Sequence, residues 1–118
     1  MLESISHIAL VVKDPARTAA LFHDLFEAGI IEREDEESHS ETFVSLGGIR
    51  IVLVGAPVER ARTGDHIAFR ATPEVIEATA EKLATKGLEF IRARSNRALY
   101  FFDYDDHVFE LDAGDLDE

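Results

Sequence analysis

A chain of 118 residues has the length of one ordinary domain, and 46% hydrophobic residues are enough to build a buried core. The formal net charge of −12 argues against nucleic acid as a partner, because phosphate binding requires a basic surface. The sequence has no cysteine and no apolar run near 18 residues, which excludes disulfides, thiolate chemistry and a helical membrane span. No signal-peptide pattern opens the sequence, so we expect a cytoplasmic protein with no membrane partner.

Short β-rich runs, taken in chain order, predict four strands in each half of the sequence. These lie at about 5–12, 29–34, 41–46 and 49–54, then at 64–70, 88–92, 98–102 and 107–111. The first strand of each half is followed by a helix, which starts after Asp14-Pro15 in one half and after Thr72-Pro73 in the other. The order βαβββ therefore occurs twice.

Turn and cap signals support these boundaries. Gly47-Gly48 predicts a tight hairpin, and the run from Asp103 to Asp106 predicts a second turn at the matching place of the second half. Gly29 and Gly87 stand where a helix would end in a left-handed C-cap. The apolar helix stripes expected to face the sheets are Thr18, Ala19, Phe22, Leu25 and Phe26, and Ile76, Thr79, Ala80 and Leu83.

We predict an α+β fold of two tandem βαβββ modules that form a curled mixed sheet around a metal cavity, with the helices on the outer face. The chain would be one domain, with the first module at about 1–55, a linker at 56–63 and the second module at about 64–118.

The tripeptide His-Ile-Ala occurs at residues 7–9 and again at 66–68 and opens both modules. Side chains two apart on a strand share a face, so His7 and His66 both lie opposite the helices. Glu110 on the last strand offers a carboxylate that is costly to bury unless it is bound, whereas the matching position, Val52, cannot ligate. Two imidazoles and one carboxylate suit Mn²⁺, Fe²⁺, Ni²⁺ or Zn²⁺ and leave open positions for water or substrate.

Four further side chains face the same predicted cavity. Glu41 could act as a general base, or it could be one more member of an acidic loop. Arg50 and Arg70 would favour an anionic substrate, or they could extend to the solvent at the rim. Tyr100 could donate a hydrogen bond or simply pack.

Three other histidines are expected to be non-ligands, because of their place on a helix, in a polar loop and on the wrong face of the last strand. They are His23, His39 and His107.

The doubled pattern, with histidine on strands one and five and glutamate on strand eight, resembles the vicinal-oxygen-chelate superfamily of glyoxalases, bleomycin-resistance proteins and dioxygenases. Within it, the stretches SISHIALVVKD, ETFVSLGGIRIVLV, DHIAFR and LYFFDYDDHVFELDAGDL are most similar to fosfomycin-resistance proteins of the epoxide-hydrolase branch. The resemblance covers nearly the whole chain, and the last stretch is the most specific.

The resemblance implies that His7, His66 and Glu110 bind a divalent ion, with Mn²⁺ as the first choice, and that Glu41 activates water. It implies a substrate-contacting role for Tyr100. It also implies a homodimer with swapped modules, in which the first histidine of one chain completes the site of the other.

The chain departs from the family pattern at Ala9, where the resistance proteins carry threonine. It also ends at Asp117 and Glu118, where they carry a phosphonate-binding arginine. Arg50 or Arg94 would have to take over the binding of an anionic group.

The expected function is a divalent-metal-dependent enzyme that opens an epoxide such as fosfomycin by addition of water or a thiol. The alternatives are a glyoxalase-like isomerase, an extradiol-type dioxygenase and a non-catalytic antibiotic-binding protein. The absence of a second glutamate at Val52 argues against the glyoxalase form, and the complete ligand set argues against a mere binder.

Overall fold

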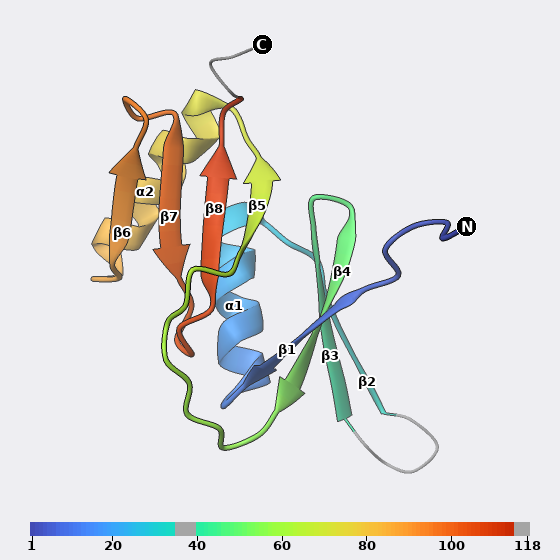
Figure 1. Ribbon diagram of the computed structural model, residues 1–118. Helices are drawn as coiled ribbons and strands as arrows, with labels where there is room; N and C mark the ends of the chain where they lie inside the picture. The colour runs from blue at the N-terminus through green and yellow to red at the C-terminus, as the bar shows by residue number, and fades with distance from the viewer. Residues whose placement is uncertain (35–39, 115–118) are drawn as a thin grey trace. The chain divides into compact units, whose positions relative to one another are not determined.

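The computed structural model describes residues 1–34 and 40–114 and consists of two compact units, Met1–Glu59 and Arg60–Glu118. The expectations for His39 and for the last residues, Asp117 and Glu118, lie outside the described part. Each unit has the predicted order of one strand, one helix and three strands (Figure 1).

In the first unit, a four-stranded sheet in the order β1-β4-β3-β2 packs on one helix. The elements are β1 (Ile8–Val12), α1 (Pro15–Phe26), β2 (Ile30–Glu34), β3 (Ser40–Leu46) and β4 (Ile49–Gly55). β1 and β4 are parallel, and the other neighbours are antiparallel, so the sheet is mixed as expected. Gly47 and Gly48 both have positive φ in the tight β3–β4 turn, which confirms that hairpin.

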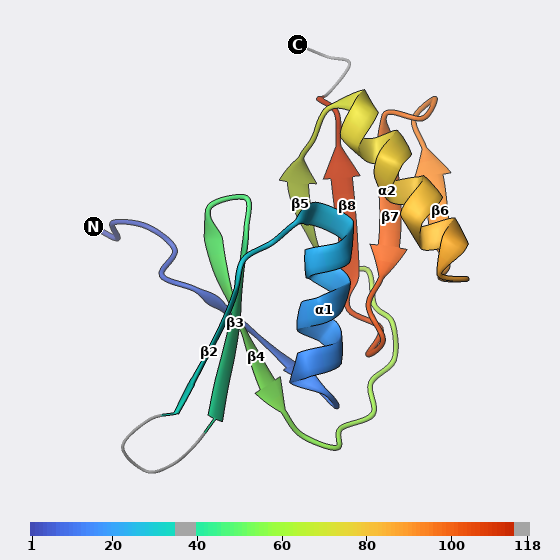
Figure 2. The same ribbon diagram turned by 180° about the vertical axis from the view of Figure 1, so that it is seen from behind.

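The second unit repeats this arrangement with the sheet order β5-β8-β7-β6. The elements are β5 (His66–Arg70), α2 (Pro73–Thr85), β6 (Phe90–Ala93), β7 (Ala98–Phe102) and β8 (Val108–Asp112). β5 and β8 form the parallel pair. Figure 1 shows α2 behind this sheet, and Figure 2, from the opposite side, shows it in front, so α2 covers one face only.

In β1, strand alternation places the buried apolar side chains on the helix side. Leu10 and Val12 are buried, whereas Ala9 and Val11 between them are exposed. The predicted stripe of α2 is buried in full, and that of α1 is buried except for Phe26, with Leu21 as an additional member. Each helix thus turns its apolar stripe to the sheet and leaves the opposite sheet face for other roles.

Asp14 and Thr72 cap the two helices as predicted. The side-chain oxygen of each accepts a hydrogen bond, 3.2 Å long, from a backbone N–H group in the first turn of its helix. Gly87 has the predicted left-handed φ of 70°. The prediction for Gly29 is wrong, because Glu27 takes the left-handed conformation with φ 56°. The Gly29 carbonyl already accepts the Ser45 N–H at 3.3 Å, so the chain has entered the sheet by that point and the helix must end earlier.

Candidate functional site

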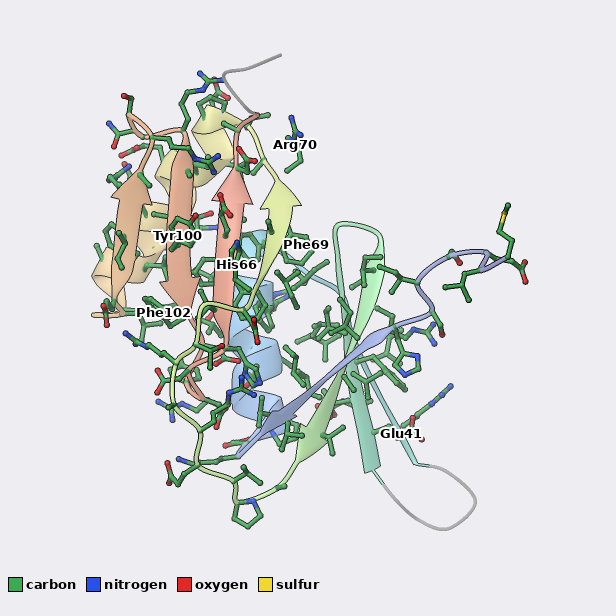
Figure 3. The ribbon with its side chains drawn as sticks, in the orientation of Figure 1. Glu41, His66, Phe69, Arg70, Tyr100 and Phe102 are labelled. Carbon is green, nitrogen blue, oxygen red and sulfur yellow. The ribbon has the colours of Figure 1, made fainter. Side chains whose placement is uncertain are left out.

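The face of the second sheet opposite α2 carries the polar side chains that the sequence singled out. The register pairs Ala68 of β5 and Tyr100 of β7 with Glu110 of β8, so His66, Tyr100 and Glu110 share this face. Figure 3 shows His66 and Tyr100 side by side on it. Their ring centroids are 5.6 Å apart in an edge-to-face arrangement with an interplanar angle of 76°.

His66 and Glu110 form the centre of this site. The Nε2 of His66 lies 3.0 Å from Oε1 of Glu110, and its Nδ1 lies 2.9 Å from the Gly64 carbonyl oxygen. A carbonyl can only accept, so Nδ1 is the donor to Gly64, and whenever the ring is neutral its Nε2 has a lone pair that a metal ion could bind. Two acceptors at this distance repel each other unless a second proton or a cation lies between them.

The donor set fits a divalent metal ion. Two ligand atoms on adjacent coordination positions, each about 2.1 Å from a common ion, are about 3 Å apart, as these two atoms are. The Glu110 side chain is only 7% exposed, and a carboxylate so buried needs positive charge beside it. Imidazole nitrogen and carboxylate oxygen are donors that Mn²⁺, Fe²⁺ and Zn²⁺ accept.

The third predicted ligand, His7, lies one residue before β1 and is exposed, with Nδ1 3.0 Å from the Ser6 hydroxyl. Within one copy of the chain, residues 1–34 and 40–114 contain no group of three histidine, cysteine or acidic side chains that could hold a metal. The two units have the same register between their parallel strands, because Ala9 pairs with Val52 in the first unit as Ala68 pairs with Glu110 in the second. The role of His7 therefore stays a prediction.

Arg94 lies against the other oxygen of the same carboxylate. Its Nη2 contacts Oε2 of Glu110 and lies 3.7 Å from Oδ1 of Asp112. Both carboxylate oxygens of Glu110 are thus engaged, one by His66 and one by Arg94. The sequence suggested Arg94 only as a binder of an anionic substrate, and its direct contact with a predicted metal ligand is a finding of the structure.

The corresponding face of the first sheet carries two more predicted site residues, Glu41 and Arg50. Glu41 on β3 lies 3.5 Å from Arg33, its direct neighbour on β2 (Glu41 is labelled in Figure 3). Two arginines lie over the Phe43 ring. The guanidinium carbon of Arg33 is 4.7 Å from the ring centroid, and the guanidinium carbon of Arg50 is 5.2 Å from it. Sequence reasoning missed Arg33, although its opposite charge across an antiparallel register was the signal that could have found it.

A family model for the Glyoxalase/Bleomycin resistance protein/Dioxygenase superfamily matches residues 4–111. The chain belongs to this superfamily. It is 34% identical to the fosfomycin resistance protein FosX of Listeria innocua, over all of this chain and 95% of the relative. It is 26% identical to the metallothiol transferase FosB of Staphylococcus saprophyticus, over all of this chain and 82% of the relative.

A solved superfamily structure gives the same result for the fold. The crystal structure of a mutant FosX from Listeria monocytogenes, complexed with Mn(II) and 1S,2S-dihydroxypropylphosphonic acid, matches with a TM-score of 0.85 at 34% identity. The match covers 99% of this chain and 97% of the other. The predicted superfamily and its paired-module fold are confirmed.

As a member of this superfamily with such relatives, the protein is a metal-dependent enzyme of the vicinal-oxygen-chelate type, and its cofactor is a divalent metal ion. No helix among residues 1–34 and 40–114 has the length and apolar character needed to cross a membrane.

Two histidines that were expected to be non-ligands have other partners. Nδ1 of His107 lies 2.7 Å from Oδ2 of Asp103 in the β7–β8 turn, and both side chains are buried. Nδ1 of His23 lies 3.1 Å from the Ala28 carbonyl just beyond α1. Both contacts lie at the end of an element, and neither includes His66 or Glu110.

Proposed function

We propose that the protein opens the epoxide ring of a fosfomycin-like phosphonate by adding water, with Mn²⁺ held by His66, Glu110 and the partner subunit's His7. The observation that carries the proposal is the distance of 3.0 Å between Nε2 of His66 and Oε1 of Glu110, two atoms that one divalent ion could bind on adjacent coordination positions. The FosX relative supports it, because that structure holds Mn(II) and a dihydroxypropylphosphonic acid. This diol has the composition of an epoxypropylphosphonic acid plus one water.

The divalent ion, when bound, polarises the epoxide oxygen and stabilises the negative charge that develops there. Glu41 of the partner subunit, which lies in the same module as His7, removes a proton from the attacking water while the water oxygen bonds to one ring carbon and the bond from that carbon to the ring oxygen breaks. The ring oxygen takes up a proton from the solvent, to which the carboxylate returns the proton that it removed, and the product is a vicinal diol. Arg33 orients the Glu41 carboxylate from 3.5 Å away.

The phosphonate is bound by positive and hydrogen-bonding side chains in a chain that is otherwise strongly acidic. The partner subunit's Arg50 and the Arg94 that lies beside Glu110 supply guanidinium groups, which match the oxygens of a phosphonate in a bidentate fashion. Tyr100, beside His66, contributes a hydroxyl.

The two units would make one domain and pair with a second copy in a homodimer with exchanged modules. This arrangement would supply the third ligand from the partner subunit. A thiol is the alternative nucleophile, since FosB, a metallothiol transferase, is also a relative. Water is favoured because the FosX relative is more similar, at 34% against 26% identity.

The proposal is tested by incubating the Mn²⁺-loaded protein with fosfomycin, alone and with thiols, and following the phosphorus by NMR. We expect the diol to form without any thiol. Glu41→Gln should lower kcat by a factor of about 10² to 10⁴ while Mn²⁺ binding is kept. The matched control is Glu32→Gln, on the neighbouring strand with the opposite orientation, which should retain activity. Unchanged turnover in Glu41→Gln would remove the base role, and a product formed only with thiols would replace water as the nucleophile.

A further inference from the structure

The guanidinium group of Arg94 lies against the buried carboxylate of Glu110. Glu110 has a side chain that is 7% exposed, whereas Arg94, which contacts its Oε2, is 42% exposed. An ionised carboxylate at such a depth is costly without a positive partner. Arg94 carries a permanent positive charge and is in direct contact with Glu110, so it balances the charge of the carboxylate in the metal-free protein.

The turn that holds Arg94 is strained. Arg94, Ser95 and Asn96 have φ values of 50°, 54° and 66°, three left-handed residues in succession without a glycine. Side chains disfavour this conformation, so the turn persists only where other contacts stabilise it. The remaining non-glycine residues with positive φ in the described chain, Glu27 and Asp106, are isolated. The Arg94–Glu110 contact helps to hold the turn, and its loss would let the turn relax.

A divalent ion and a guanidinium compete for this carboxylate. Two positive charges a few ångströms apart repel each other, so the buried Glu110 would be shared between them only at a cost. Arg94 is tethered to a surface turn and can move away, whereas Glu110 is fixed in a central strand between β5 and β7. Arg94 is therefore the partner that leaves.

We propose that Arg94 is a displaceable counter-ion of Glu110. It neutralises the carboxylate in the metal-free protein, leaves when the divalent ion binds, and then presents its guanidinium to the anionic group of the substrate. The inference rests on the proposed function, because it takes Glu110 as a metal ligand. It makes metal binding precede strong substrate binding, since Arg94 is occupied until the ion arrives.

The experiment compares Arg94→Ala with Arg92→Ala in the full chain. Arg92 is a matched control, because it lies two residues earlier, on β6, and is 33% exposed, but it pairs with Glu77 on the α2 side of the sheet. Mn²⁺ affinity is measured by the EPR signal of free Mn²⁺, and the melting temperature is measured with and without saturating Mn²⁺.

Arg94→Ala is expected to bind Mn²⁺ about tenfold more tightly than wild type, because the competing cation is gone. It should melt at a lower temperature than wild type without metal and at nearly the same temperature with metal. Arg92→Ala should leave the Mn²⁺ affinity unchanged and lower the melting temperature equally in both states. Arg94→Lys, which keeps the charge, should remain closer to wild type than Arg94→Ala.

Equal or weaker Mn²⁺ binding by Arg94→Ala, in a chain whose wild type binds Mn²⁺, would overturn the counter-ion role and leave the proposed function standing. Absence of Mn²⁺ binding by wild type and by all variants would overturn the proposed function together with this inference.

Discussion

Asp103 is the buried acceptor that fixes the β7–β8 turn, and its removal should be strongly destabilising. Its side chain is fully buried. Oδ1 accepts the backbone N–H groups of Asp105 and His107, each at 2.9 Å, and Oδ2 lies 2.7 Å from Nδ1 of His107. Asp103→Ala would leave three donors without this acceptor in the interior. With about 1 kcal/mol for each backbone bond and about 2 kcal/mol for the charge-assisted bond, the free energy of unfolding should fall by about 4 kcal/mol.

Urea unfolding of the metal-free protein, followed by circular dichroism, measures this loss. Asp103→Asn keeps an oxygen for the two N–H groups and should lose about half as much. The exposed Asp65→Asn serves as a control and should change stability by less than about 0.5 kcal/mol. If the free energy of unfolding of Asp103→Ala were within about 1 kcal/mol of the wild-type value, the hydrogen bonds of Asp103 would not be what stabilises this turn.

Two further predictions concern ion pairs on the second unit. Arg62→Ala should lower the free energy of unfolding by about 1 kcal/mol, because Arg62 pairs with both Asp106 and Glu89 at 2.8 Å. If the loss of stability were the same in roughly 1 M salt, its origin would not be electrostatic. The bidentate hydrogen bonds from Arg92 hold the pKa of Glu77 below its usual value of 4.5. Glu77→Gln should therefore be less stable than wild type above pH 4.5. Urea unfolding at a series of pH values should show that the difference in free energy of unfolding shrinks as the pH falls below 4.5. A difference that stays constant with pH would refute the contribution of this ion pair.

Much of the fold followed from short-range signals whose physical cause lies within a few residues. Asp14 and Thr72 with their following prolines marked both helix starts, and Gly47-Gly48 marked a hairpin that requires positive φ at two positions. The end of α1 was missed, since the sheet pairing of Gly29 with Ser45 depends on a partner 16 positions later in the chain. A cap signal alone does not contain that information.

The candidate site was predictable where strand alternation decides it. His66, Tyr100 and Glu110 share a face because the side-chain period of a strand is two and the register is fixed by burial of the other face. The contact of Arg94 with Glu110 was not predictable, because it depends on three left-handed residues in a turn without glycine. Arg33 lies beside Glu41 because of the β2–β3 register, and a prediction of this contact would have needed that register.

His66 and Glu110 are proposed to hold a divalent ion together with the partner subunit's His7. The decisive measurement is Mn²⁺ titration of Glu110→Gln, of His7→Ala and of an equal mixture of the two, each compared with wild type. Each variant alone should bind Mn²⁺ at least about 100-fold more weakly, and the mixture should regain some sites of wild-type affinity, because one mixed pairing restores all three ligands. Wild-type Mn²⁺ affinity in Glu110→Gln would contradict the claim.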